Sequence, residues 1–210
     1  THMERVGWLK CLLLTLEIFL LYSMLLNTKQ RSASDYLLVV YVDGSCLGNQ
    51  NVDAETVAAW GVVIVEGDSK LGRGTGDIIH EFCGKVITNP DEEGFLGADV
   101  GSNNTAELSA MAHALRWLLL QEGKDAVMIR TDSTYAGNLT SGAWKAKANK
   151  EMVRRLRLLW DDVSALRPLE WEHIRAHSGH RWNERADHLA FRTANDETVT
   201  PLGFWKPGQR

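Results

Sequence analysis

Hydrophobic residues in the first half of the chain form runs that predict β-strands. Residues 36–45 and 57–65 are almost continuously apolar, which is typical of central strands covered on both faces of a sheet. Residues 78–88 show a weaker strand pattern. The turn Gly67-Asp68-Ser69 separates the second run from the third, and short connections of this kind favour antiparallel neighbours. The first half therefore predicts three antiparallel strands.

The second half alternates helical and extended patterns. Apolar residues recur at helical spacing over residues 103–121, where Asn103 or Asn104 can cap the helix. Further helices are expected at residues 133–139, 149–166 and 182–193, and strands at residues 126–131 and 169–174. Strand–helix–strand units form parallel crossovers. The chain is thus predicted to be an α/β protein with a five-stranded mixed sheet, three antiparallel strands followed by two parallel ones, and helices on both faces.

The two ends of the chain depart from this pattern. Within residues 8–26, the run from 11 to 26 is apolar on all sides except at Glu17, but it is shorter than the about 20 apolar residues that span a bilayer. A buried or partner-packed helix, a signal or anchor segment, and disorder all remain open for this N-terminal segment. The polar residues before 36 resemble a linker, so we expect an N-terminal segment at 1–35 and a domain at 36–195. A polar tail at 196–210 is expected to be loose.

Composition narrows the class of protein only slightly. The net charge of −4 is only a weak argument against nucleic-acid binding. A cluster of acids at a metal site lowers the total charge, and only the local charge matters to a phosphate backbone. The three cysteines, Cys11, Cys46 and Cys83, show no paired spacing, which favours a reducing compartment and no cysteine-type zinc site. We expect an intracellular protein, cytoplasmic, nuclear or organellar, with membrane anchoring through residues 8–26 left open.

Four carboxylates fall at the ends of elements that should be neighbours in one sheet. They are Asp43, Glu107, Asp132 and Asp187. Each alone could be a turn former, a favourable charge at a helix N-terminus, a helix cap or a solvated residue. Four acids brought together repel one another unless a cation lies between them. The set therefore predicts a site for hard divalent ions, and two such ions can hold the attacking and leaving oxygens of a phosphodiester.

Histidines cluster in the turn before the last helix. His177 precedes Ser178-Gly179, and its imidazole titrates near the working pH, so it could carry a proton at the site. A zinc site of His173, His177 and His180 is an alternative, although no cysteine joins them and His173 lies on a strand. We expect His180 to serve the hydrogen bonds of the loop itself.

A basic run begins before the penultimate helix and continues along it. Its members are Trp144, Lys145, Lys147, Asn149, Lys150, Arg154, Arg155 and Arg157, and one acid, Glu151, interrupts them. Such a run is often only a solvated helix face. A positive run with an aromatic residue in an acidic protein instead favours contact with a phosphate backbone.

Over residues 36–192 the chain resembles a type 1 ribonuclease H. Four motifs carry the resemblance: Asp43-Gly44-Ser45-Cys46-Leu47-Gly48-Asn49, Asn103-Asn104-Thr105-Ala106-Glu107-Leu108, Thr131-Asp132-Ser133, and His177-Ser178-Gly179-His180 through Asn183-Glu184-Arg185-Ala186-Asp187. The resemblance implies the ribonuclease H-like fold and cleavage of the RNA strand of RNA–DNA hybrids with two Mg²⁺ ions, for which Mn²⁺ could substitute. Products would carry a 5′-phosphate and a 3′-hydroxyl. The four carboxylates would bind the metal, and His177 would assist proton movement or product release.

The resemblance also implies a set of substrate contacts. These are Cys46, Asn49, Ser102, Asn103, Asn104, Thr134, Trp144, Lys147, Asn149 and Asn183. Asn103 and Asn104 are suited to hydrogen-bond a 2′-hydroxyl, the group that distinguishes RNA from DNA. Asn149 resembles a residue that holds a phosphate of the DNA strand. The chain departs from many bacterial members in its short segment 142–147, which stands where they carry a basic protrusion, and in its long acidic loop at 89–102.

Other functions remain open from the sequence. The chain could be a hybrid- or duplex-binding module without catalysis, but such a module would not need all four acids. It could be another nuclease or a strand-transfer enzyme on the same fold. It could also be the ribonuclease H domain of a retroelement polyprotein. We expect a monomer that uses no small-molecule cofactor.

Overall fold

The computed structural model describes residues 38–48, 52–53, 55–176 and 178–209. Several sequence predictions lie outside these residues, namely those on the apolar segment 8–26, the domain boundary at residue 35, Asn49 and His177. Among the helices described, none is both long and apolar enough to cross a membrane.

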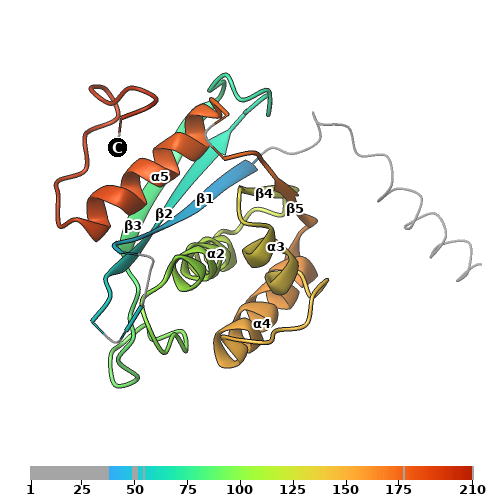
Figure 1. The fold of residues 1–210 in the computed structure, drawn as a ribbon. Helices are drawn as coiled ribbons and strands as arrows, with labels where there is room; N and C mark the ends of the chain where they lie inside the picture. Colours follow the sequence, from blue (N-terminus) through green and yellow to red (C-terminus); the bar gives the residue numbers. More distant parts are fainter. Residues whose placement is uncertain (1–37, 49–51, 54, 177, 210) are drawn as a thin grey trace, which may run out of the picture. The chain divides into compact units, whose positions relative to one another are not determined.

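A mixed five-stranded sheet forms the centre of the protein, as predicted (Figure 1). Its strands are β1 (Leu38–Cys46), β2 (Ala58–Glu66), β3 (Asp77–Lys85), β4 (Val127–Thr131) and β5 (Leu169–His173), in the spatial order β3-β2-β1-β4-β5. The first three pair antiparallel. β4 pairs parallel with both β1 and β5. This order brings the carboxyl ends of β1 and β4 to the same edge of the sheet.

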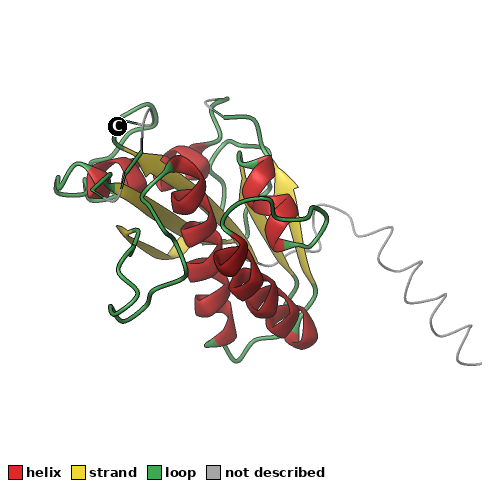
Figure 2. Ribbon diagram, turned by 60° about the horizontal axis from the view of Figure 1, so that its bottom comes forward, coloured by secondary structure: helices red, strands yellow, loops and turns green. Residues whose placement is uncertain are grey.

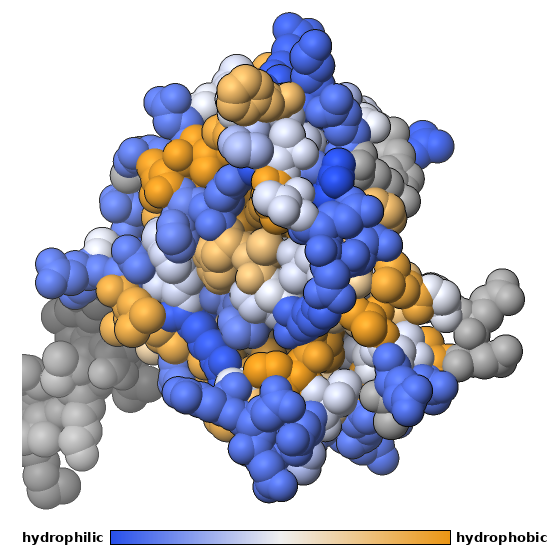
Figure 3. Space-filling model, turned by 90° about the vertical axis from the view of Figure 1, so that its left-hand side faces the viewer, coloured by the Kyte–Doolittle hydropathy of each residue, from blue (hydrophilic) through white to orange (hydrophobic). Residues whose placement is uncertain are grey.

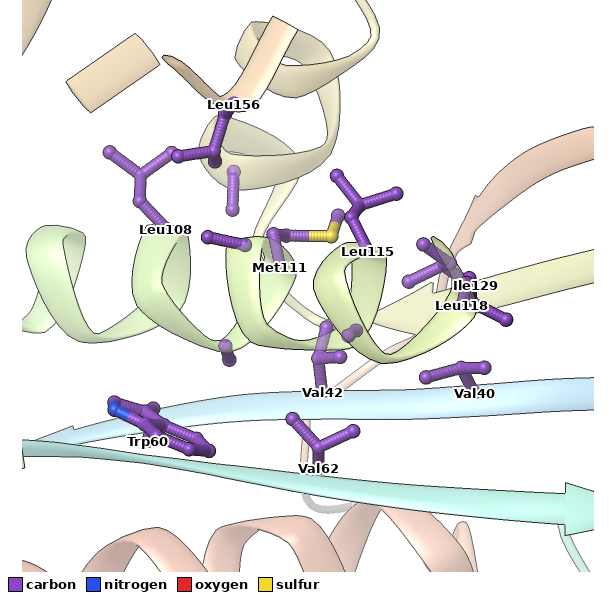
Figure 4. Close-up of a cluster of buried hydrophobic side chains, with 14 of the residues drawn as sticks. Val40, Val42, Trp60, Val62, Leu108, Met111, Leu115, Leu118, Ile129 and Leu156 are labelled. Atoms are coloured by element: carbon purple, nitrogen blue, oxygen red, sulfur yellow. The ribbon is translucent and has the colours of Figure 1, made fainter. Parts of the chain in front are cut away.

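Helices cover both faces of the sheet (Figure 2). α2 (Asn103–Leu119), α3 (Thr134–Thr140) and α4 (Lys150–Leu166) belong to one layer, and α5 (Arg181–Ala194) packs on β1 and β2 from the other side. Because successive strand residues point to opposite faces, β1 contributes to two cores. Val40 and Val42 pack under α2 (Figure 4), whereas Val39 and Tyr41 pack under α5.

The first turn of α2 corrects one prediction. Ser102 caps this helix, instead of Asn103 or Asn104: its hydroxyl accepts from the Thr105 backbone N–H at 3.1 Å, and the Thr105 hydroxyl accepts from the Ser102 N–H at 2.8 Å. This reciprocal capping box fixes where the helix begins. It leaves the Asn103 and Asn104 side chains available at the start of the helix.

The prediction of a loose tail at residues 196–210 is wrong. Trp205 is only 3% exposed, and the guanidinium groups of Arg181 and Arg185 lie 5.6 and 5.4 Å from its ring centroid. The imidazole of His188 also holds the tail, accepting from the Thr200 N–H at 3.1 Å and contacting the Gln209 carbonyl at 3.0 Å. The polar composition of the tail does not indicate this packing, in which the buried side chain of Trp205 holds the tail against α5. Figure 3 shows this side of the molecule, where apolar side chains lie among a mainly polar surface.

Candidate active site

Three chain segments converge where β1 and β4 end. Asp43 lies on β1, Asp132 directly follows β4, and Glu107 lies in the second turn of α2. A glycine at position 44 makes this convergence possible. A Cβ there would lie 2.5 Å from the Glu107 backbone nitrogen and 2.8 Å from the Ala106 Cβ, so a larger residue would push α2 away from the strand. The Asp-Gly pair on β1 therefore sets the distance between the first two carboxylates.

The carboxylates of Asp43, Glu107 and Asp132 form a compact cluster. One ligand oxygen from each lies within 4.8 Å of the others. Asp43 and Glu107 are 5% and 4% exposed, and Asp132 is half-buried. Asp187, from α5, lines the same cavity of about 380 Å³ without joining this tightest group. The structure thus brings three of the four predicted carboxylates together and places the fourth at the same cavity.

The surroundings of the cluster fit a hard divalent cation. Glu107 Oε2 is buried and has no hydrogen-bond partner among the described residues. Burial, followed by the charges of Asp43, Asp132 and Asp187, holds the pKa of Glu107 well above its usual range. An orphaned buried carboxylate oxygen is costly without a proton or a cation. An all-oxygen donor set of this kind suits Mg²⁺, Mn²⁺ or Ca²⁺.

Asp43 is held in place by neighbours on two elements. Its Oδ1 accepts from the Gly44 backbone N–H at 2.8 Å, and its Oδ2 accepts from the Asn183 amide at 3.3 Å. Asn183 is 5% exposed. Its amide therefore orients a candidate metal ligand, a different role from the predicted direct contact with substrate.

The other predicted contact residues divide between two neighbouring cavities. Asn103 and Thr134 line the carboxylate cavity. A second, more apolar cavity of about 620 Å³ is lined by Asn104, Tyr135, Leu139, Ala143, Trp144, Lys145, Lys147 and Ala148. Tyr135 belongs to both cavities, and its hydroxyl accepts from the Asn149 amide at 3.2 Å. Tyr135 was not predicted from the sequence. The only sign of a role at the site was its position directly after Thr134, a predicted substrate contact.

Three other residues singled out in the sequence are not among those that line the two cavities. Ser102 is occupied as the cap of α2. Cys46 is half-buried at the end of β1, its sulfur 3.7 Å from the Leu47 carbonyl, and burial raises the pKa of its thiol. His180 does not serve the loop's hydrogen bonds as expected. Its Nδ1 is buried against Gly72 without a hydrogen-bond partner in the described part of the chain.

The three arginines of the basic run are engaged within the protein. Arg154 and Arg155 both pair with Glu151 at 2.8 Å, and their hydrogen bonds lower the pKa of Glu151 to about 2. Arg157 hydrogen-bonds backbone carbonyls. The three lysines of the run, Lys145, Lys147 and Lys150, are exposed. The predicted phosphate contact therefore rests mainly on lysines near the second cavity.

The raised pKa of Glu107 predicts how cation binding depends on pH. A raised pKa in the folded state stabilises the metal-free protein below the unfolded pKa, and that stabilisation is lost as pH rises through the folded value. A cation binds the deprotonated carboxylate, so the increase in Tm on adding Mg²⁺ should be small at low pH and grow as Glu107 loses its proton. Thermal unfolding with and without Mg²⁺ from about pH 5 to about pH 8 measures this. Glu107→Gln should weaken the pH dependence; an equal dependence in both proteins would contradict the assignment.

Comparison with known proteins agrees with this geometry. The family model described as RNase H matches residues 35–195. The chain is 31% identical over 174 residues to the Ribonuclease H of Anaplasma marginale, covering 78% of this chain and 94% of that protein. It is 32% identical over 165 residues to the Ribonuclease H of Ruegeria pomeroyi, covering 73% and 89%.

Solved structures give the same result for the fold. RNase H1 from the halophilic archaeon Halobacterium salinarum superimposes with a TM-score of 0.55 at 25% identity, covering 76% of this chain and 98% of that one. LC11-RNase H1, solved in complex with an RNA/DNA hybrid, gives 0.53 at 22% identity, covering 76% and 97%, and shares the fold. The resemblance to retroelement domains stays a prediction. With the sheet order, the clustered carboxylates and the match over residues 35–195 in agreement, the chain belongs to the ribonuclease H family of enzymes.

Proposed function

We propose that the protein hydrolyses the RNA strand of RNA–DNA hybrids with two divalent metal ions, leaving a 5′-phosphate and a 3′-hydroxyl. The cluster of Asp43, Glu107 and Asp132 is the observation that carries this proposal, because its buried Glu107 oxygen, which has no hydrogen-bond partner among the described residues, is stabilised by a cation. Asp187, at the same cavity, is the fourth proposed ligand. Mg²⁺ is the proposed ion, and Mn²⁺ is a proposed substitute.

Each group of the chain has a defined task in this proposal. When bound, the metal ions would activate a water and stabilise the leaving oxygen of the phosphodiester. Asp43, oriented by the Asn183 amide, and Glu107, fixed on α2 through the Gly44 contact, would hold them. His177, which lies outside the described residues, is proposed to move protons at the site. Glu107 must be deprotonated when the cation is bound, so the metal also settles its charge state.

The two cavities suit the two strands of a hybrid. Asn103 and Thr134 line the carboxylate cavity, where an amide and a hydroxyl can hydrogen-bond a 2′-hydroxyl. Trp144, Lys147 and Asn104 line the second cavity, where an indole can stack on a base or sugar and an ammonium can meet a phosphate. Tyr135 joins the two surfaces. We propose that RNA lies over the first cavity and DNA over the second.

The proposal is tested by cleavage of an end-labelled RNA–DNA hybrid in Mg²⁺, beside single-stranded RNA, double-stranded RNA and double-stranded DNA. We expect only the RNA strand of the hybrid to be cut. The new 5′ ends should carry phosphates, which a ligation assay detects. Hybrid that is bound but never cut in Mg²⁺ or Mn²⁺ would replace the enzyme assignment with a binding module. Cleavage of double-stranded DNA would instead favour another nuclease on this fold.

A further inference from the structure

The loop between α3 and α4 carries much of the second cavity. It runs from Ser141, at the C-cap position of α3, to Asn149, at the N-cap position of α4. Trp144 lies in it with 49% of its surface exposed. A half-exposed indole on a loop has many rotamers and backbone positions available, and ordering it on binding would cost affinity. Contacts that already order this loop in the free protein would reduce that cost.

Arg157 makes the contacts that fix this loop. This half-buried residue lies on α4, two turns from its start. Its Nε donates to the Leu139 carbonyl, in the last turn of α3, at 3.1 Å. Its Nη2 donates to the carbonyl of Trp144 itself. The Trp144 N–H in turn donates to the Asn138 carbonyl at 3.0 Å, so hydrogen bonds hold both polar groups of the Trp144 backbone.

The chemistry of these contacts is specific to a guanidinium group. A planar fork of donors can bond two carbonyls on different segments at once, whereas an ammonium is a point charge on a flexible stem. The neighbouring Arg154 and Arg155 cannot take this role in the structure, because both pair with Glu151. Arg157 is thus the member of the basic run that joins α3, the loop and α4.

We propose that Arg157 is a positioning residue for the hybrid: it holds Trp144 at the wall of the second cavity, ready to receive the DNA strand, without itself touching a phosphate. This inference rests on the proposed function of the same surface. It gives Arg157 a different role from the lysines of the run, which would meet the phosphates directly.

The test compares Arg157→Ala and Arg157→Lys with the wild type, and uses Arg167→Ala as the matched control. Arg167 is a buried arginine at the far end of α4 that, like Arg157, donates from its guanidinium to a backbone carbonyl: its Nη2 donates to the Gln121 carbonyl at 2.9 Å. Two quantities are measured on the full chain below the Tm of every variant: steady-state kcat and KM on an RNA–DNA hybrid, and the rate of trypsin cleavage after Lys145 and Lys147.

We expect Arg157→Ala to raise KM about fivefold or more, the loss expected when base stacking is disordered, with kcat within about twofold of wild type. Trypsin should cut the loop faster in this variant, and Arg157→Lys should resemble Arg157→Ala. Arg167→Ala should lower the Tm and leave KM and loop cleavage unchanged.

Three results would overturn the inference: an unchanged KM with Arg157→Ala, full restoration by Arg157→Lys, or equal changes in Arg167→Ala. Failure of the proposed function is distinguishable from these, because the wild type would then not cut the hybrid at all. The trypsin measurement would in that case still decide whether Arg157 holds the loop.

Discussion

Asp132→Asn should abolish hybrid cleavage and at the same time stabilise the metal-free protein. Its carboxylate lies in a cluster with those of Asp43 and Glu107, and it raises the pKa of Glu107. Loss of one anionic ligand should reduce kcat by about 100-fold or more. Removing the Asp132 charge, which repels Asp43 and disfavours the ionised form of Glu107, should raise the free energy of unfolding by about 1 kcal/mol in the absence of metal.

The paired measurement separates a metal ligand from a structural acid. Cleavage rates and thermal unfolding with and without Mg²⁺ are compared with those of Asp161→Asn, which makes the same chemical change at an exposed position on α4. The control should keep its activity, its Tm and its response to Mg²⁺. Lower metal-free stability in Asp132→Asn, with the Mg²⁺ response intact, would assign Asp132 a structural role.

Glu81→Ala should cause the largest loss of stability. Arg185 on α5 is fully buried, and its guanidinium donates to both oxygens of Glu81, at 2.8 and 2.6 Å, and to the Thr200 carbonyl at 2.8 Å. Removing Glu81 leaves a buried charge whose remaining contacts among the described residues are the Thr200 carbonyl and the Trp205 ring, which should cost about 3 kcal/mol. For a domain of this size the Tm should fall by about 6–12 °C.

Denaturant unfolding can show that the unpaired charge is the cause. Adding Arg185→Met to Glu81→Ala removes that charge and should recover part of the lost stability. Glu197→Ala breaks the more exposed pair with Arg192 and should cost less than about 1 kcal/mol. A cost for Glu81→Ala as small as that of Glu197→Ala would show that the Arg185 guanidinium finds water or another partner.

The order of elements and the four carboxylates were predictable from the sequence because both depend on local pattern. Strand runs and helical spacing fix the elements, and an acid at the end of each of several elements is visible without coordinates. The predicted cap of α2 was one or two residues too late, since Ser102, Asn103 and Asn104 are all good caps and the sequence does not show which of them takes the capping conformation.

The remaining features depend on contacts between distant residues. The Asn149 amide meets the hydroxyl of Tyr135, which lines both cavities, and two arginines of α5 lie against the ring of Trp205, which anchors the tail. Arg157 looked like a phosphate-binding residue because a charge run does not show which of its members are already engaged. No period or spacing in the sequence carries this information.

The pairing of β1 with β4 has a consequence for the order of folding. Leu38 lies opposite Val127, so these strands meet only after most of the intervening chain has been brought together, whereas β1, β2 and β3 follow one another through short connections. Closing so long a segment carries an entropic cost that local hairpins avoid. Topology therefore predicts that the meander of β1 to β3 forms early and that β4 joins late. The carboxylates of Asp43 and Asp132 come together only when β4 joins β1, so a cation held by both can stabilise the chain only from that point onward.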